Sequence, residues 1–458
     1  MSNLDKPSIN ESSRMPREKK IKITIVVVLC LVIFVLCVIA MRTINDSPVE
    51  MPVELETVPD VKVEYDEWYV AQSSWKDGAW CIVDKEAVTS INIVESYAGQ
   101  YATVWDIDEM LFYFTDDGAI YITVGPGVHM IGSMSAAFAN FPNALTITGL
   151  DKLETSAVTD MSYIFSESGF ESIDISNWDT SGVTNFAYML YKTTNTKEVN
   201  MSNLDLSQVV DISYMFANSE AIENIYIENV DTSHILIMTG MFKNMGSSSH
   251  VNPTKIHGTL RTDSCTDMSS MFEYSSISNV IDIVKDFNTS NVTNMEKMFF
   301  HSLDLYELDL SQWDVSKVKN MNYMFTESIC LIRLNMEGWN PINLETADYM
   351  FQYCYNLRKF DQWISAPKIK SAQHMFENCY ELTSLDVTCF DGAKIKDAKR
   401  MFYCVQYVEH IYSNGFTVEN FNDDMFEYCV SLKGPTEYDM DKITSEMATT
   451  TGYLTPTK

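Results

Sequence analysis

A short motif that recurs along the chain constrains its fold more than any other feature. Most copies contain an apolar residue followed, three and four positions later, by Met and Phe or similar residues. Twelve copies occur, and the last residues of successive copies lie 24 to 30 positions apart, most often 26. These last residues are Phe138, Phe165, Leu190, Phe216, Phe242, Phe272, Phe299, Phe325, Phe351, Phe376, Phe402 and Phe426. A unit this short cannot bury its apolar face alone, so we expect the copies to stack.

The spacing within each repeat predicts one short helix and one short strand. Apolar residues at i, i+3 and i+4 lie on one face of a helix. A capping residue directly precedes many copies, namely Asp160, Asn185, Asp211, Asp267, Asn294 and Asn320. Further along each repeat, two apolar residues separated by one position indicate a half-buried strand. The pairs include Ile173/Ile175, Val199/Met201, Ile225/Ile227, Ile281/Ile283, Leu308/Leu310, Leu334/Met336 and Leu385/Val387.

We therefore predict an α/β repeat solenoid over residues 134–433, with about twelve leucine-rich-repeat-like turns. Each turn would contain one short parallel strand and one short helix. Residues 67–133 contain strand-like stretches and turn signals, and we expect a β-rich N-terminal capping unit there. Residues 434–458 would form a C-terminal cap and tail.

Two segments carry a resemblance to a known family. Residues 176–185 read Ser-Asn-Trp-Asp-Thr-Ser-Gly-Val-Thr-Asn, and residues 308–325 repeat the Trp-Asp element before Asn-Met-Asn-Tyr-Met-Phe. They resemble the repeat of BspA-family leucine-rich-repeat surface proteins, and the resemblance covers about residues 134–433. An insertion around residues 246–250 departs from it. The resemblance implies a cell-surface protein of the kind associated with adhesion to host components or other cells.

An apolar run near the N-terminus predicts a membrane anchor. Residues 23–41 contain one clearly polar side chain, and a helix of that length spans about 28 Å, close to a bilayer core of about 30 Å. Residues 1–22 are basic, whereas residues 42–66 are rich in Pro and Glu and resemble a stalk. The positive-inside rule then places the N-terminus in the cytoplasm and the repeats outside the cell. A cleaved signal peptide, a lipid-modified cysteine at Cys30 or Cys37 and a buried core helix are the alternatives for this run.

Charge and motif content exclude several classes of function. The chain has 63 acidic and 32 basic residues, a formal charge of −31, which argues against a nucleic-acid partner. No hydrolase, zinc-protease or phosphate-loop motif occurs, and the seven histidines show no metal-ligand spacing. We therefore expect no enzymatic activity, no catalytic residue, no metal and no cofactor. Calcium bound by surface carboxylates is an alternative, although no EF-hand loop is present.

The strand residue between each pair of apolar residues should point to the exposed face of the sheet. In order these are Thr148, Asp174, Asn200, Tyr226, His257, Asp282, Asp309, Asn335, Asp361, Asp386 and Tyr412, which we call the stripe. Acidic groups on adjacent strands repel unless a cation or a basic partner lies between them. We predict a ligand-binding surface whose main residues are Tyr226, Asp282, Asp309, Asn335, Asp361, Asp386 and Tyr412. The alternative is a solvated face whose aspartates belong to the repeat pattern.

Cysteines occupy one repeat position in the C-terminal copies. Cys354, Cys379 and Cys429 each follow the final Phe by three residues. Neighbouring copies could be close enough for a disulfide, but buried free thiols that fill space are the favoured interpretation.

Taken together, these patterns predict a single-pass membrane protein that displays an acidic solenoid on the cell surface. We expect recognition or adhesion through an extracellular protein or glycan partner. The alternative is a structural cell-envelope protein with no specific ligand.

Overall fold

The computed structural model describes residues 84–97, 99, 103–107, 110–124, 129–246, 253–360, 363–420 and 424–457. The chain divides into two compact units, and all described residues belong to the second, Tyr65–Lys458. Among the described residues, no helix combines the length and apolar character needed to cross a membrane. The predicted cytoplasmic tail 1–22, membrane span 23–41 and stalk 42–66 lie outside them.

The described chain consists mainly of short strands joined by turns. The strands are β1 (Ser90–Val94), β2 (Thr103–Ile107), β3 (Met110–Phe114), β4 (Ala119–Val124), β5 (His129–Ser133), β6 (Thr146–Thr148), β7 (Glu154–Asp160), β8 (Ser172–Asp174), β9 (Glu198–Asn200), β10 (Asn224–Ile227), β11 (Lys255–Gly258), β12 (Glu307–Asp309), β13 (Arg333–Asn335), β14 (Ser384–Asp386), β15 (Lys394–Ile395), β16 (His410–Tyr412), β17 (Thr417–Val418) and β18 (Leu454–Thr455). The helical elements are α2 (Val280–Val284) and the 3-10 helices η2 (Lys85–Ala87), η3 (Leu150–Lys152), η4 (Thr388–Phe390) and η5 (Ser445–Met447).

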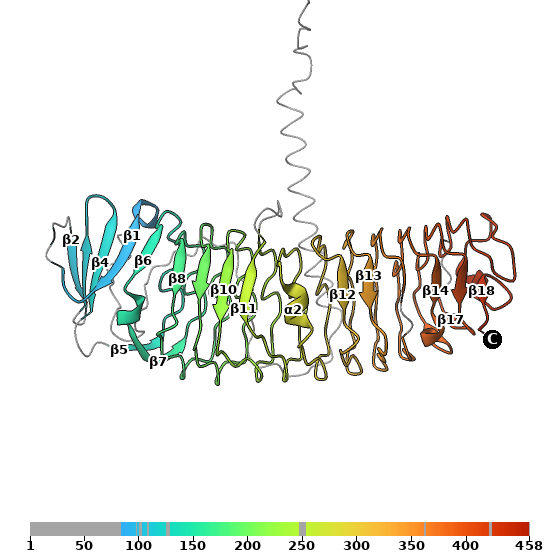
Figure 1. The fold of residues 1–458 in the computed structure, drawn as a ribbon, viewed down its shortest axis with the longest axis horizontal. Helices are drawn as coiled ribbons and strands as arrows, with labels where there is room; N and C mark the ends of the chain where they lie inside the picture. The colour runs from blue at the N-terminus through green and yellow to red at the C-terminus, as the bar shows by residue number, and fades with distance from the viewer. Residues whose placement is uncertain are drawn as a thin grey trace, which may run out of the picture. The chain divides into compact units, whose positions relative to one another are not determined.

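The repeats form a β-solenoid of about twelve turns with little helix. Their strands pair in parallel and in register, as in Ile173↔Val199 between β8 and β9 and Ile225↔Ile256 between β10 and β11 (Figure 1). The inward residue of each pair is buried. Stacked parallel strands were therefore predicted correctly for β8–β10 and β12–β14. The register between β10 and β11 also continues across the insertion at 246–250.

The predicted helix in each repeat is wrong, because the structure has two β-turns at that place. In the copy that ends at Leu190, the Met189 amide donates to Phe186 O (3.3 Å) and the Tyr191 amide to Tyr188 O (3.1 Å). Tyr188 has a φ of 59°, the left-handed value required at the third residue of a type II turn. The amides of Tyr188 and Leu190 donate to carbonyls of the next turn instead. A helix this short would leave most of its amides unpaired, whereas stacking pairs them.

The expected capping residues accept an amide of the segment that follows them, as predicted, although that segment consists of turns and not of a helix. Asp160 Oδ1 accepts the amide of Ser162 at 3.0 Å, and Asn185 Oδ1 accepts the amide of Ala187 at 3.0 Å. These side chains therefore close Asx turns that bond two residues ahead. The same positions pair with one another from turn to turn as bridges, for example Asp160↔Asn185. We call this second set of parallel bridges, which runs from Asp160 to Asp397, the Asx ladder.

One predicted strand is a helix. Residues 280–284 form α2, so Ile281 and Ile283 are not a strand pair, and Ile281 is exposed. The side chain of Asn279 explains the difference. Its amide nitrogen donates to Ile256 O at 2.7 Å and its oxygen accepts the Ile256 amide at 3.1 Å. The Asn279 side chain thus makes the two hydrogen bonds to β11 that a neighbouring strand would make. The backbone after Asn279 does not continue the parallel strand pairing.

A column of phenylalanine rings runs through the core. From Phe216 to Phe426, successive final Phe rings stack with centroids 5.5–6.0 Å apart. Leu190 takes the same buried position in its turn. The left-handed turn residues and the i, i+3, i+4 spacing together direct these side chains inward, so the burial that the motif predicts is present without the helix.

Both ends of the described unit are closed. At the N-terminal end, β1–β4 join β6 in one sheet of order β2-β3-β4-β1-β6, and β1 pairs in parallel with both β4 and β6. At the C-terminal end, β18 pairs with β16, and Tyr453 is buried beside Phe426 (centroids 5.3 Å apart). The solenoid core is therefore covered at each end by chain that departs from the repeat.

The cysteines at the shared repeat position are buried free thiols. Cys354 Sγ donates to Phe325 O at 3.0 Å, and Cys379 Sγ donates to Phe351 O at 3.0 Å. One turn before Cys354, Ser328 Oγ makes the same bond to Phe299 O at 2.8 Å. Burial raises the pKa of the Cys354 thiol, so it stays protonated and donates. In these neighbouring copies, Ser328, Cys354 and Cys379 therefore make equivalent bonds to the Phe carbonyl of the preceding copy.

We expect Cys354→Ser to change the free energy of unfolding by less than about 1 kcal/mol, because the hydroxyl replaces the thiol bond. Cys354→Ala removes the donor and leaves a small void, and we expect a loss of roughly 1–2 kcal/mol. Urea unfolding monitored by circular dichroism would compare the two. A serine variant less stable than the alanine variant would contradict a shared donor position.

Candidate functional site

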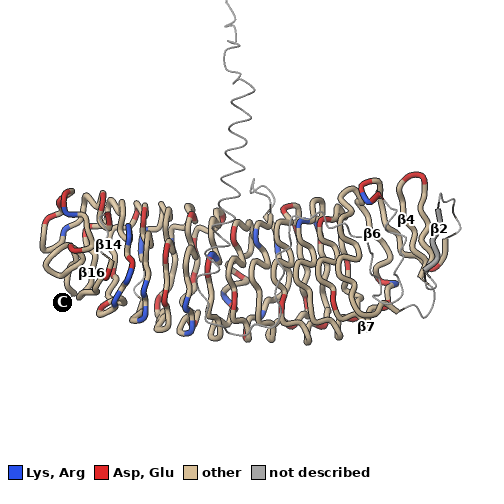
Figure 2. The backbone as a smooth tube through the Cα atoms, turned by 180° about the vertical axis from the view of Figure 1, so that it is seen from behind, with Lys and Arg blue, Asp and Glu red and all other residues tan. Residues whose placement is uncertain are grey.

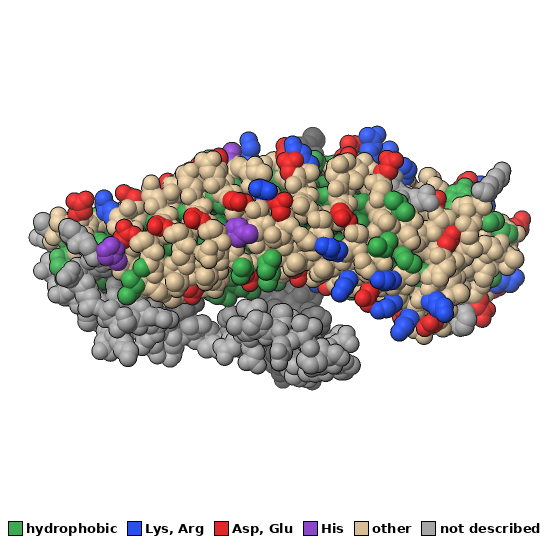
Figure 3. Space-filling model, turned by 90° about the horizontal axis from the view of Figure 1, so that it is seen from below, with side chains coloured by type: hydrophobic (Ala, Val, Ile, Leu, Met, Phe, Trp, Pro, Cys, Tyr) green, Lys and Arg blue, Asp and Glu red, His purple; other side chains and the backbone are tan. Residues whose placement is uncertain are grey.

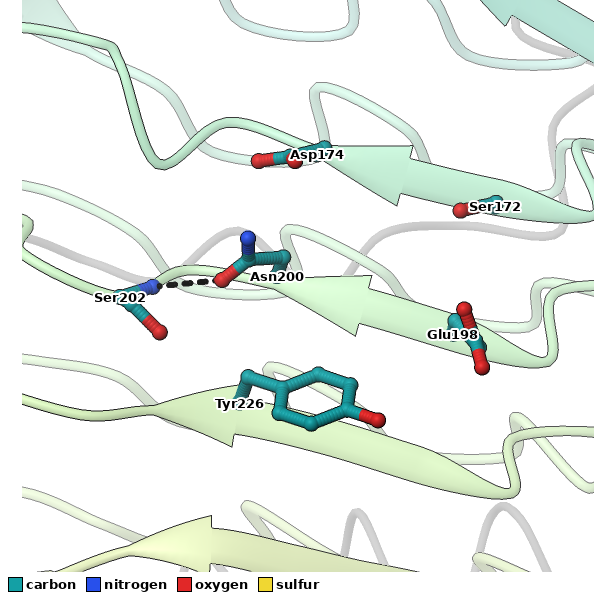
Figure 4. Close-up of a pocket in the computed structure, with 6 residues that line it drawn as sticks. All are labelled: Ser172, Asp174, Glu198, Asn200, Ser202 and Tyr226. Atoms are coloured by element: carbon teal, nitrogen blue, oxygen red, sulfur yellow. Dashed lines mark hydrogen bonds between the residues drawn. The ribbon is translucent and has the colours of Figure 1, made fainter.

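An open hollow of about 300 Å³ lies on the exposed face of strands β8, β9 and β10. Its lining residues are Ser172, Asp174, Glu198, Asn200, Ser202 and Tyr226. Parallel register brings them together, because Ser172 lies beside Glu198 and Asp174 beside Asn200. Figure 4 shows Asp174, Asn200 and Tyr226 on three successive strands, with the Tyr226 ring extended along its strand toward the Glu198 side. We call this hollow the strand-face groove.

The ring of Tyr226 lines the groove and stacks on His257, which lies outside the lining residues. The Tyr226 and His257 rings stack with centroids 4.5 Å apart and an interplanar angle of 13°. Their backbones are in register on β10 and β11, which places the rings one turn apart. His257 Nε2 also contacts Asn224 Oδ1 at 3.0 Å, which fixes the imidazole. The stack orders Tyr226 in advance of any ligand, so less side-chain entropy is lost on binding.

Several polar stripe residues have a structural task. Asp174 Oδ1 accepts the amide (3.0 Å) and the hydroxyl (2.7 Å) of Ser176, and Asp309 accepts the same two bonds from Ser311. The Ser311 bonds lower the pKa of Asp309 below its usual value. Asn200 accepts the amide of Ser202 at 3.1 Å. These residues close the turn after each strand, which supports the alternative interpretation that the aspartates belong to the repeat pattern.

The structure divides the predicted stripe instead of keeping it continuous. Asp282 lies on α2 with its carboxylate 3.4 Å from Lys285 Nζ, so its predicted place on a strand face is wrong. Asp361 lies outside the described residues. The other predicted site residues lie on two sheets separate from the groove: Asp309 and Asn335 on β12 and β13, Asp386 and Tyr412 on β14 and β16. Of the predicted site residues that the structure describes, only Tyr226 lines the groove.

Adjacent stripe positions among the described strands never pair two carboxylates. Asp174 faces Asn200, Asp309 faces Asn335 and Asp386 faces Tyr412. The repulsion expected between neighbouring aspartates is therefore absent from these pairs. Within the described part of the chain, no group of three His, Cys, Asp or Glu side chains lies close enough to hold a metal ion.

Three lining residues were missed by the sequence analysis. Ser172 and Glu198 lie two positions before Asp174 and Asn200 and so share the face of the stripe. Ser202 lies two positions after Asn200. The period of two was the available signal, because extending each stripe position by two residues in both directions yields all three.

The groove combines acceptors, donors and a ring in one small area. Carboxylates of Asp174 and Glu198 can accept hydrogen bonds from hydroxyl groups, and the Asn200 amide and the serines can donate or accept. An aromatic face beside such groups suits a sugar ring or a polar peptide segment. These groups can hold a ligand through hydrogen bonds and ring contact, and the hydroxyl of Ser202 already donates to Glu228 Oε2 at 2.8 Å.

A known family model matches the repeats. The model of a Mycoplasma protein of unknown function, DUF285, matches residues 132–255, 246–366 and 332–438. Together these matches cover residues 132–438, about two thirds of the chain. No curated protein and no solved structure matches the chain. The resemblance to the BspA family is not confirmed by these comparisons.

Proposed function

We propose that this chain, which belongs to the DUF285 family of Mycoplasma proteins of unknown function, is a membrane-anchored surface protein for recognition or adhesion. Its repeat solenoid would bind an extracellular glycan or protein. The groove carries this proposal, because it gathers a preordered aromatic ring and convergent hydrogen-bonding groups on an exposed face.

Two features of the sequence support the same proposal. The apolar run 23–41 with its basic N-terminal flank would anchor the protein and place the repeats outside the cell. The likeness of residues 176–185 and 308–325 to BspA repeats points to surface proteins associated with adhesion. Repeat solenoids present extended surfaces that suit such partners.

We expect Tyr226→Ala to weaken ligand binding by at least about tenfold, because it removes the stacked ring that lines the groove. Arrays of glycans and extracellular-matrix proteins probed with the full chain would identify the ligand, and titration would then compare variants. Tyr306→Ala is the matched control, because Tyr306 is an exposed tyrosine (57%) outside the groove.

The same experiment separates the proposal from a structural role in the cell envelope. Equal binding by wild type and both variants would remove the groove from the interaction. Absence of any captured ligand across the arrays would favour the envelope protein, a role with which the turn-closing aspartates are consistent.

A further inference from the structure

A basic surface lies on another ladder of the solenoid, away from the strand-face groove. In a chain with a formal charge of −31, six lysines gather on the segments that directly precede the Asx ladder. They are Lys317, Lys319, Lys368, Lys370, Lys394 and Lys396, all exposed, and we call them the basic strip. Figure 3 shows Lys and Arg side chains gathered on the C-terminal half of the molecule. Figure 2 shows Lys and Arg positions on consecutive turns of the solenoid backbone.

Backbone hydrogen bonds place the strip lysines in register. The amide of Lys396 donates to Lys370 O (2.7 Å), that of Lys370 to Glu345 O (2.8 Å), and that of Glu345 to Lys319 O (2.9 Å). These four residues therefore form one column on successive turns. Lys317, Asn343, Lys368 and Lys394 lie two residues earlier on the same turns and form a second column.

Buried residues between the two columns fix the direction of the lysines. Val318, Leu344, Ile369 and Ile395 separate the columns, and all four are buried in the core. Residues on either side of a buried strand-like position point outward together. The columns therefore face the solvent side by side, roughly 7 Å apart along the chain and about 4.8 Å from one turn to the next.

The positive charge of the strip is only partly compensated. Lys317 Nζ donates to Asn291 Oδ1 (2.8 Å), and Lys368 Nζ donates to Asn343 Oδ1 (2.6 Å). These neutral acceptors orient the ammonium groups along the columns without cancelling their charge. Glu345 is the carboxylate within the columns, and it pairs with Lys370. The Lys370 hydrogen bond, with further help from Lys319 and Lys368, lowers the pKa of Glu345.

We propose that the basic strip binds a linear sulfated polysaccharide. The strip is two columns wide and four turns long, the shape of an extended polymer. One turn of the solenoid is similar in length to one sugar residue. Three of the four turns present two lysines each, so the matching polymer carries more than one anionic group per sugar, which sulfation supplies and a single carboxylate does not.

Other anionic partners fit this surface less well. A flat anionic membrane would meet the acidic remainder of the molecule as well as the strip, and a net charge of −31 opposes that approach. Single-stranded nucleic acid is held by aromatic side chains that stack on bases, and neither column contains an aromatic residue between Asn291 and Lys396. The polysaccharide site is separate from the groove and goes beyond the recognition proposed for it.

The test uses the full chain, purified in nonionic detergent, with heparin as the probe. The variant Lys319→Gln, Lys394→Gln, Lys396→Gln removes three lysines for which the described structure gives no ion pair. Lys152→Gln, Lys197→Gln, Lys255→Gln is the control, since it removes the same charge from exposed positions of the N-terminal half. Binding would be titrated at several salt concentrations beside hyaluronan, vesicles that contain phosphatidylglycerol, and duplex DNA.

We expect the strip variant to bind heparin at least about tenfold more weakly than wild type, with a smaller salt dependence, and the control to match wild type. Hyaluronan should bind more weakly than heparin, and Tyr226→Ala should leave heparin binding unchanged, which separates this site from the groove. An equal loss in both triple variants would overturn the proposal. So would wild-type binding to vesicles or DNA as tight as to heparin, or no binding to heparin at all.

Discussion

Replacement of Phe325 by alanine is expected to lower the free energy of unfolding by about 3–5 kcal/mol. The ring is fully buried and stacks on Phe299 and Phe351 at centroid distances of 5.5 and 5.6 Å. Its removal leaves a void that the hydrogen-bonded turns on both sides cannot collapse to fill. Because each turn of a solenoid contacts only its neighbours, the loss also weakens the coupling between the two halves. Thermal unfolding should therefore broaden or separate into two transitions.

Phe325→Leu is the matched control, because leucine occupies the equivalent position at Leu190 and is buried there. We expect this variant to lose no more than about 1.5 kcal/mol and to keep a single transition. Calorimetry would measure both. Equal losses for the alanine and leucine variants would mean that the column of rings does not determine stability at this turn.

Gly149→Ala is expected to disrupt the connection between the N-terminal sheet and the solenoid. Gly149 follows β6 and has a φ of 75°, a conformation that costs an L-residue roughly 1–2 kcal/mol. A Cβ there would lie 2.0 Å from Ile93 O and 2.9 Å from Ile93 C, both backbone atoms of β1. Since β1 pairs with β4 and with β6, either β1 or β6 must move. We expect a total loss of about 3 kcal/mol or more, from the strain and the broken pairing together.

Gly338→Ala separates the two causes of that loss. Gly338 also has a left-handed φ, 86°, but an added Cβ meets no atom within 4 Å. It should lose only the conformational cost, about 1–2 kcal/mol. Hydrogen exchange would locate the effects, with faster exchange in β1 and β6 for Gly149→Ala and unchanged exchange in β12 and β13. Equal stability of the two variants would contradict the backbone contact as the cause.

The sequence predicted the stacking of the repeats and most strands, but not the local form of the Met-Phe motif. The spacing i, i+3, i+4 is common to a helix face and to two consecutive turns. A helix and a pair of β-turns differ in the carbonyl to which each amide donates. The amides of Tyr188 and Leu190 donate to carbonyls of the next repeat. Contacts between copies are needed to see that. Likewise, Ile281 and Ile283 have the spacing of a strand pair, and the side chain of Asn279 determines the outcome.

The candidate site was partly predictable. Tyr226 was identified from its strand position, and Ser172 and Glu198 follow from the same alternation. The turn-closing role of Asp174 and Asp309 was present in the sequence as a hydroxyl residue two positions later. The sequence did not predict the basic strip, because a net charge of −31 for the whole chain gives no sign of a local cluster of lysines. It emerges only when the register places Lys319, Lys370 and Lys396 on one column.

The direction of the hydrogen bonds has a mechanical consequence for a protein of this shape. The amide-to-carbonyl bonds between turns, such as Phe325 to Met350 (2.9 Å), run along the axis on which the turns stack. A force applied along that axis would load the interfaces between turns in series, so each carries the whole load and the weakest yields first. A pull along the axis can therefore lengthen the protein one turn at a time.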